Sequence, residues 1–281
     1  MHGMVAGRGD ANGDTNAIRR SGCPPRAFAG RRSAGGVGRS SEELQNIVLL
    51  HGFGGTRHAW DGVIARLPPE RCRPLALDLP GHGEIADAER PITFAGCVDH
   101  VLVRAPERFA LCGYSLGGRV ALHVALAAPA RVTRLVLVST TAGIERAAER
   151  AERSAADHRL ADELERIPFE DFIERWRTQP LFAGDPPEVG RLAREDQRRN
   201  RPDALAAVLR GIGSGEMAPL WDRLGELTMP VTVLVGDRDA KFRALAERMV
   251  RLLPNAELVA AAGGHGLPLE NPAAVAWALD R

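Results

Sequence analysis

A glycine-flanked serine is the first group in this sequence whose setting could support nucleophilic or proton-transfer chemistry. Ser115 lies in Gly113-Tyr-Ser-Leu-Gly117, which matches the pattern G-x-S-x-G between a strand-like apolar run and a helix-like segment. In that context the turn is too tight for side chains on its glycines, and it lifts the serine hydroxyl above the sheet. The pattern predicts that Ser115 is catalytic and that the backbone N–H of Leu116 can donate to an oxyanion.

A serine hydroxyl needs a base, and the base needs an acid that orients it. His265 stands between glycines after the last apolar run, and Asp237 and Asp239 both follow the run Val231–Val235. We predict a triad of Ser115, Asp239 and His265. Asp239 is preferred because it lies deeper in its loop, and Asp237 is the alternative. The chain order Ser, Asp, His is typical of α/β hydrolases.

Two further loops follow strand-like runs. His51-Gly-Phe-Gly-Gly55 comes after the first such run, where the second oxyanion donor is expected, so the N–H of Phe53 is predicted to supply it. His51 itself is interpreted as orienting this loop. The turn-rich loop from Asp78 to Gly83 is interpreted as structural.

Strand-like and helix-like segments alternate along most of the chain. Strands are expected at 46–51, 74–78, 108–112, 132–138, 231–235 and 256–260, and helices at 56–67, 116–128, 242–253 and 271–281. This alternation predicts an α/β fold with a mostly parallel sheet and helices on both faces. Residues 143–221 lack strand-like runs, and we predict a helical lid there, over the carboxyl ends of the strands. The predicted core is then 43–142 and 222–281, preceded by a disordered basic tail at 1–42.

Composition narrows the class of protein. The chain has 281 residues, 44% of them hydrophobic, with 37 basic and 36 acidic side chains. Residues 1–40 hold seven Arg and two Asp, so they carry +5 and the remainder carries 30 basic minus 34 acidic charges, or −4. An acidic body argues against nucleic acid as a partner, and no apolar run approaches the roughly 20 residues of a membrane span. Four widely spaced cysteines fit a reducing, cytoplasmic setting without a metal or disulfide framework. No cofactor is expected, and the partner is a small molecule.

Lys241 is the single lysine of the chain, against 36 arginines. A coding bias toward arginine is the simple explanation. Because a compact ammonium and a planar guanidinium are not interchangeable, a lysine that survives such a bias hints at a tight site.

From about Ile47 onward the sequence resembles α/β-hydrolase-fold enzymes. Among these it is most similar to the 2-succinyl-6-hydroxy-2,4-cyclohexadiene-1-carboxylate synthases of menaquinone biosynthesis. The motifs that carry the resemblance are Gly113–Arg119, Glu149–Asp157, Trp176–Phe182, Arg198–Asn200 and Gly236–Phe242. The strand that usually precedes the His-Gly loop is not recognisable in residues 1–45.

The resemblance implies a triad and an oxyanion hole made of the residues already named. It also implies six side chains that contact the substrate: Tyr114, Arg119, Arg153, Trp176, Arg198 and Lys241. For the two lid arginines, Arg150, Arg194 and Arg199 are close competitors.

The implied activity is that of a lyase. It eliminates pyruvate from 2-succinyl-5-enolpyruvyl-6-hydroxy-3-cyclohexene-1-carboxylate, a substrate with three carboxylates. Ser115, deprotonated through His265, would remove a proton next to a ketone, and the enolate would be held by the oxyanion donors. A carboxylesterase or C–C-bond hydrolase with the same triad is the alternative enzyme. A non-catalytic binding protein is the alternative of another class, and the intact triad counts against it.

Overall fold

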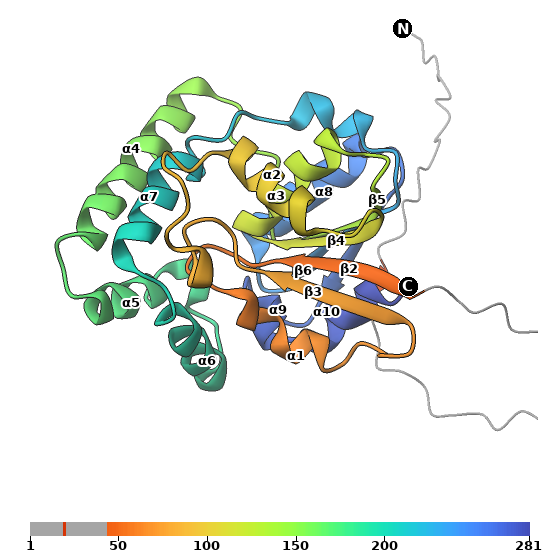
Figure 1. Cartoon of the computed structure of the whole chain (residues 1–281), viewed down its shortest axis with the longest axis horizontal. Coiled ribbons are helices and arrows are strands. Elements are labelled where there is room, and N and C mark those ends of the chain that lie inside the picture. The colour runs from red at the N-terminus through yellow and green to blue at the C-terminus, as the bar shows by residue number, and fades with distance from the viewer. Residues whose placement is uncertain (1–18, 21–43) are drawn as a thin grey trace, which may run out of the picture.

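The sheet consists of six parallel strands of six or seven residues, with a two-residue strand at one edge. The structure, a computed structural model, describes residues 19–20 and 44–281 (Figure 1). The strand order is β1-β7-β6-β5-β4-β2-β3, and every pair is parallel. The strands are β1 Arg19–Arg20, β2 Gln45–Leu50, β3 Cys72–Leu77, β4 Phe109–Tyr114, β5 Val132–Val138, β6 Val231–Gly236 and β7 Ala256–Ala261.

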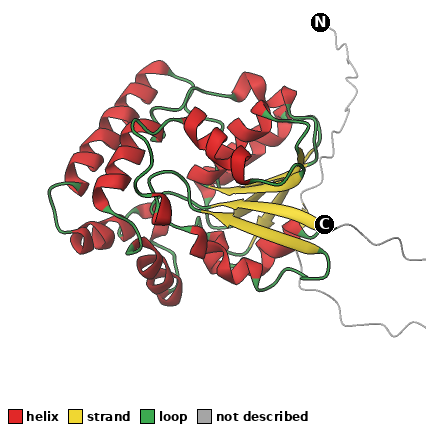
Figure 2. Ribbon diagram, in the orientation of Figure 1, coloured by secondary structure: helices red, strands yellow, loops and turns green. Residues whose placement is uncertain are grey.

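Helices cover both faces of the sheet, as Figure 2 shows. One face carries α2 (Phe94–Arg104), α3 (Leu116–Ala127) and α8 (Ala240–Leu252), which share an apolar core with β4 and β5. The other carries α1 (Asp61–Ile64), α9 (Leu267–Glu270) and α10 (Pro272–Leu279), packed over a second core. Burial on both faces explains why the central strands are uninterrupted apolar runs. The predicted α/β fold is confirmed.

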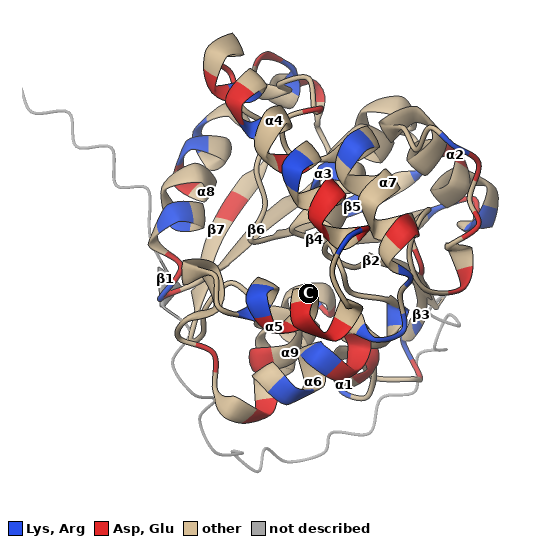
Figure 3. Ribbon diagram, turned by 90° about the vertical axis from the view of Figure 1, so that its left-hand side faces the viewer, with Lys and Arg blue, Asp and Glu red and all other residues tan. Residues whose placement is uncertain are grey.

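Four helices are inserted between β5 and β6. They are α4 (Ala147–Leu164), α5 (Phe169–Arg177), α6 (Pro187–Gln197) and α7 (Pro202–Ile212). They lie beyond the carboxyl ends of the strands and have an apolar cluster of their own, built around Leu164, Phe172 and Leu205 (Figure 1). Acidic and basic residues are interspersed along these helices (Figure 3), so their outer surface carries no field of a single sign. A helical insertion was expected in this interval.

Some local expectations differ from the structure. The segment 56–67 is not one helix: it forms a 3₁₀ turn, Arg57–Trp60, followed by the single turn of α1. Gly62 and the two prolines after Leu67 disfavour a longer helix, and the two short turns still bury Trp60 and Val63. The helix α2, which begins at a Thr93 cap, was not anticipated.

The edges of the sheet also differ from expectation. Arg19 and Arg20 pair with Val259 and Ala260 of β7, so the described part of the predicted tail is a short strand on that edge. The rest of the predicted tail lies outside the described residues. At the opposite edge, no described strand pairs with the outer side of β3.

Three cysteines in the described part of the chain, Cys72, Cys97 and Cys112, are buried free thiols. Burial raises the pKa of the Cys97 thiol to about 12, which keeps it protonated and unreactive. Within residues 19–20 and 44–281, no helix has both the length and the apolar character needed to cross a bilayer.

Candidate active site

The turn between β4 and α3 holds Ser115 in a strained conformation. Its φ of 52° and ψ of −109° lie outside the regions that ordinary residues prefer. The neighbouring glycines permit this turn: a Cβ on Gly117 would lie 2.2 Å from the carbonyl oxygen of Leu50, and one on Gly113 would lie 2.3 Å from that of Gly117. Strain of this kind persists only where surrounding structure enforces it, and it is concentrated at functional sites.

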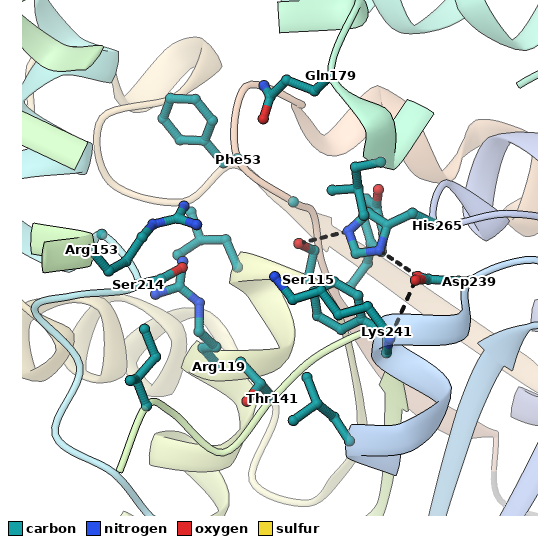
Figure 4. Close-up of a pocket in the computed structure, with 18 of the residues that line it drawn as sticks. Phe53, Ser115, Arg119, Thr141, Arg153, Gln179, Ser214, Asp239, Lys241 and His265 are labelled. Atoms are coloured by element: carbon teal, nitrogen blue, oxygen red, sulfur yellow. Dashed lines mark hydrogen bonds and ion pairs between the residues drawn. The ribbon is translucent and has the colours of Figure 1, made fainter. Parts of the chain in front are cut away.

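Ser115, His265 and Asp239 form a continuous hydrogen-bonded chain (Figure 4). His265 Nε2 lies 3.2 Å from Ser115 Oγ, and His265 Nδ1 lies 2.8 Å from Asp239 Oδ2. The other carboxylate oxygen of Asp239 accepts from Phe242 N at 3.3 Å and caps α8, so the acid is fixed at both oxygens. The arrangement can move a proton from the serine hydroxyl to the imidazole and stabilise the resulting charge.

Asp237, the alternative acid, does something else. Its Oδ1 accepts a hydrogen bond from the backbone N–H of Gly263 at 3.1 Å, which braces the turn that leads to His265. The geometry therefore brings Asp239, and not Asp237, to the imidazole.

The first residue of α3 and the loop after β2 border the same space. Leu116 is the first residue of α3, where an N–H has no partner within the helix, and the positive end of the helix dipole points outward. Gly52 and Phe53, from the loop after β2, line the cavity with Leu116. His51 lies beneath this loop, fully buried, and accepts from the N–H of Leu79 at 3.0 Å. Its position fits an orienting function.

The cavity in front of Ser115 has a volume of about 770 Å³, and the cations that line it include Arg119 of α3, Arg153 of α4 and Lys241 of α8; Arg146, Arg238 and Arg248 line it as well. Figure 4 shows Arg119, Arg153 and Lys241 around Ser115. Arg119 is only 7% exposed, and burial lowers the pKa of its guanidinium to about 10, so it stays charged at neutral pH. Among the described residues, neither Arg119 nor Lys241 has a carboxylate within ion-pair distance.

Aromatic side chains form the opposite wall. Trp176 of α5 packs on Phe53 with ring centroids 5.0 Å apart, and Phe182 packs on Trp176 at 6.1 Å. Tyr114 lies 5.4 Å from the His265 ring, and burial raises the pKa of its phenol well above the ordinary value. The cavity therefore combines cationic and acidic side chains with flat apolar surfaces.

Arg198 lies apart from the other residues singled out from the sequence. Its guanidinium binds Glu170 of α5 through Nε at 2.9 Å and Nη2 at 2.8 Å, on the outer surface of the insertion. It does not line the cavity, and neither do the competing arginines, which engage the insertion's own backbone and acids: Arg150, Arg194 and Arg199.

Sequence reasoning missed two acids of the site. Asp157, 2% exposed, accepts from Arg153 Nε at 2.8 Å and so fixes the direction of that guanidinium. The i,i+4 spacing of the pair on one helix could have revealed it. Asp185 forms a buried ion pair with Arg177 beside the His265 loop, and burial raises the pKa of its carboxyl group. Nothing in the local sequence indicates that second pair.

In the two described ranges, no three His, Cys, Asp or Glu side chains are grouped so that they could hold a metal ion.

The fold and site define a class of protein. Residues 47–279 match the family model described as the alpha/beta hydrolase family, and the chain belongs to that family. Within it, the chain is similar to the 2-succinyl-6-hydroxy-2,4-cyclohexadiene-1-carboxylate synthase of Salmonella typhimurium. The two are 33% identical over 240 residues, covering 82% of this chain and 90% of that protein.

Solved structures of related proteins have the same fold. The structure of MenH from S. aureus superimposes with a TM-score of 0.77 and 31% identity, covering 84% of this chain and 92% of that one. A thermophilic esterase from Thermogutta terrifontis, whose structure is described as malate bound, superimposes with a TM-score of 0.70 and 26% identity. That match covers 83% of this chain and 87% of the esterase. The resemblance to the synthases that the sequence motifs suggested is confirmed.

Proposed function

We propose that this protein is a lyase that eliminates pyruvate from 2-succinyl-5-enolpyruvyl-6-hydroxy-3-cyclohexene-1-carboxylate in the cytoplasm. The observation that carries the proposal is the combination of a Ser115–His265–Asp239 chain with the three cations Arg119, Arg153 and Lys241 in one cavity. A substrate with three carboxylates needs several fixed cations, because charge-assisted hydrogen bonds are the strong kind. The similarity to the Salmonella synthase supports the same reaction.

The chemistry can be assigned to atoms. His265 Nε2 takes the proton of Ser115 Oγ, and the alkoxide removes the proton next to the succinyl ketone. As the enolate collapses, a double bond forms between ring carbons 2 and 3, the double bond between carbons 3 and 4 moves to carbons 4 and 5, and the bond from carbon 5 to the enolpyruvyl oxygen breaks. Enolpyruvate leaves and becomes pyruvate after protonation. The enolate oxygen is stabilised by the N–H groups of Phe53 and Leu116, and Asp239 stabilises the imidazolium.

The insertion is proposed to act as the lid of this site. It contributes Arg153 and Trp176 to the cavity, and Asp157 orients the arginine. A cover over the carboxyl ends of the strands would exclude water, which strengthens every charge interaction inside. We propose that this lid spans residues 143–221. Arg198 pairs with Glu170 on the outer surface, so the proposed substrate contacts do not include it.

A pyruvate-release assay with the enolpyruvyl substrate tests the proposal. Wild-type protein should release one pyruvate per substrate consumed, and Ser115→Ala should lower turnover by roughly 10³-fold or more. Absence of pyruvate from an active-site-competent preparation would refute the synthase reaction. Competence is established independently by stoichiometric labelling with a serine-directed phosphonate.

A carboxylesterase is the second candidate, and the same hydrogen-bonded chain supports it. The similarity to the Thermogutta terrifontis esterase favours this alternative. Rapid turnover of a small neutral ester without pyruvate release would support it. A slow ester activity beside efficient pyruvate release would support the synthase.

A further inference from the structure

The end of α6 contacts the loop that carries Phe53, although the two segments are about 140 residues apart in the sequence. Three buried polar side chains make this contact: Asp196, Gln197 and Asn200, which we call the α6 clamp. Each is at most 7% exposed. Burying a carboxylate or an amide is unfavourable unless it is hydrogen-bonded, so the partners of Asp196 and Asn200 indicate what these two residues do. The Gln197 amide oxygen has no hydrogen-bond partner among the described residues.

Asp196 holds the loop at Thr56. Its Oδ2 accepts from the Thr56 backbone N–H at 2.8 Å, and its Oδ1 accepts from the Thr56 hydroxyl. The loop approaches closely, because a Cβ on Gly55 would lie 3.3 Å from Asp196 Oδ2. The nearest cation, Arg199 Nε, is 3.8 Å away. The carboxylate is therefore satisfied mainly by one residue of the loop.

Asn200 connects two loops. Its Nδ2 donates to the carbonyl oxygen of Gly54 at 2.8 Å, and its Oδ1 accepts from the N–H of Gly83 at 3.0 Å. The N–H of Gly54 in turn donates to His82 Nε2 at 3.3 Å. Gly54 adopts a φ of +73°, and a Cβ there would lie 3.3 Å from the Gln197 amide nitrogen, so only glycine fits this position without strain.

These contacts help to fix the orientation of the peptide between Gly52 and Phe53. The carbonyl oxygen of Gly52 accepts from the N–H of Gly55 at 3.1 Å, and His51 Nδ1 lies 2.8 Å from it. In a trans peptide the C=O and the N–H point in opposite directions. Because Gly55 and His51 hold the Gly52 carbonyl oxygen, the N–H of Phe53, which belongs to the same peptide, points in the opposite direction, toward the space next to Ser115. A Cβ on Gly52 would lie 3.5 Å from that of Ser115, which shows how near this peptide is.

We infer that Asp196 and Asn200 are positioning residues that fix the Phe53 N–H as an oxyanion donor from the insertion. The inference rests on the proposed function only in taking this N–H as a donor to the reacting oxyanion. On this account the insertion does more than cover the substrate: its α6 end is a fixed support for part of the catalytic backbone. Loosening the clamp should weaken stabilisation of the transition state and leave binding of the ground state unchanged.

The test measures how fast Ser115 reacts with a small neutral p-nitrophenyl phosphonate. The Ser115 Oγ–P bond forms, p-nitrophenolate leaves, the serine proton passes to His265, and the phosphoryl oxygen occupies the oxyanion position. Because losing one oxyanion donor costs about 10²–10³ in rate, a displaced donor in Asp196→Ala should slow labelling by about 10- to 100-fold. Asp196→Asn, which keeps one acceptor, should recover part of the rate. Glu195→Gln removes a neighbouring exposed carboxylate and is the matched control, with the wild-type rate.

Binding is measured separately. The dissociation constant of the enolpyruvyl substrate is compared in Ser115→Ala and in the double variant Ser115→Ala/Asp196→Ala by calorimetry. The two values should agree within about twofold, a difference of less than 0.5 kcal/mol. An equal loss in binding and labelling would overturn the inference, because the clamp would then shape the whole cavity.

A milder pair of variants separates an effect on labelling from an effect on folding. Thr56→Val removes the hydroxyl bond to Asp196 and the bond that the same oxygen accepts from the His58 N–H at 3.3 Å, and it should slow labelling, whereas Thr56→Ser keeps both bonds and should label at the wild-type rate. If Asp196→Ala and Thr56→Val lower the melting temperature but label at the wild-type rate, the clamp serves only the fold and the inference is wrong. Wild-type protein that the phosphonate does not label would also overturn the inference. If wild-type protein labels normally and releases no pyruvate, the proposed function fails while the clamp remains testable.

Discussion

Asp237 and Asp239 are two residues apart, and the structure gives them different tasks. Asp239 divides its oxygens between His265 and the first turn of α8, while Asp237 braces the Gly263 turn. The difference follows from position: Asp239 caps α8 and lies next to the His265 imidazole. A carboxylate held at both oxygens can fix the tautomer and ring orientation of its histidine.

Exchanging each aspartate for asparagine separates these tasks. Asp239→Asn should lower turnover of the enolpyruvyl substrate by roughly 10³-fold or more, because the imidazolium loses its counter-charge and the imidazole its preferred tautomer. Asp237→Asn keeps an acceptor for the Gly263 N–H and should cost much less. The measurement is kcat for both variants at equal melting temperature. A dead Asp237 variant beside an active Asp239 variant would reverse our choice of acid.

At the scale of elements, sequence reasoning worked where burial imposes a pattern. The strand at 132–138 was predicted to the residue, since a strand buried on both faces is a short apolar run. The G-x-S-x-G turn was located because its glycines are sterically required. The segment 56–67 was misjudged because apolar spacing does not distinguish one helix from two short turns.

Contacts between distant segments could not be predicted. Nothing near Asp196 in the sequence points to Thr56, 140 residues away, and nothing near Arg198 distinguishes a cavity residue from a surface partner of Glu170. Both depend on how the insertion packs on the core. By contrast, Arg119 could be placed, because it lies one helical turn after Ser115 on the same helix.

The strand–turn–helix element around Ser115 should be intolerant of any added side chain. In Gly117→Ala, the new Cβ would lie 2.2 Å from the Leu50 carbonyl oxygen, a backbone atom that cannot move aside without shifting β2. We expect a loss of about 3 kcal/mol in the free energy of unfolding, at the upper end of the usual cost of overpacking. Gly225→Ala is the control, since its Cβ would meet nothing within 4 Å. Equal unfolding midpoints in urea for the two variants would contradict this account.

The helices α3, α4 and α8 bring Arg119, Arg153 and Lys241 to the cavity, and these cations predict selectivity for charged substrates. Lys241→Ala and Arg119→Ala should each reduce kcat/KM for the enolpyruvyl substrate by about 10- to 150-fold, the equivalent of about 1.5–3 kcal/mol per charge-assisted pair. Turnover of a small neutral ester should barely change. Arg243→Ala on the same helix as Lys241, where Arg243 pairs with Glu247, is the control. Equal losses on both substrates would mean that the cations serve the fold.

At the scale of the whole molecule, the candidate site is built from residues between His51 and His265, on the six strands β2 to β7 that follow the amino-terminal segment. The contact described for that segment is the two-residue pairing of β1 with β7. Deleting residues 1–42 should therefore shift the melting temperature by no more than about 4 °C, the effect of about 1 kcal/mol in a domain of this size. Activity should be unchanged. A drop of about 10 °C or more would show that the segment packs on the body.

Acid should destabilise the whole molecule through two buried histidines that lie under the Phe53 loop. His51 and His82 are both fully buried, and burial holds the pKa of each imidazole below the ordinary 6.5, farther below for His82, which also faces His51. The neutral form is required structurally, since Nε2 of each ring accepts from a backbone N–H, of Leu79 and Gly54 respectively.

The direction of the pH effect follows from proton uptake on unfolding. Below pH 6.5 the unfolded chain binds protons at these histidines and the folded chain does not, so the free energy of unfolding falls as the pH is lowered. Each histidine should contribute a slope of about 1.4 kcal/mol per pH unit between its folded pKa and 6.5. Urea unfolding of wild-type protein and His82→Gln between pH 7 and pH 5 measures it. The variant starts from lower stability because it loses the fitted ring, but its curve should be shallower by about one proton. Parallel curves would mean that His82 is protonated in the folded molecule, and the hydrogen bond from Gly54 would then have to be reassigned.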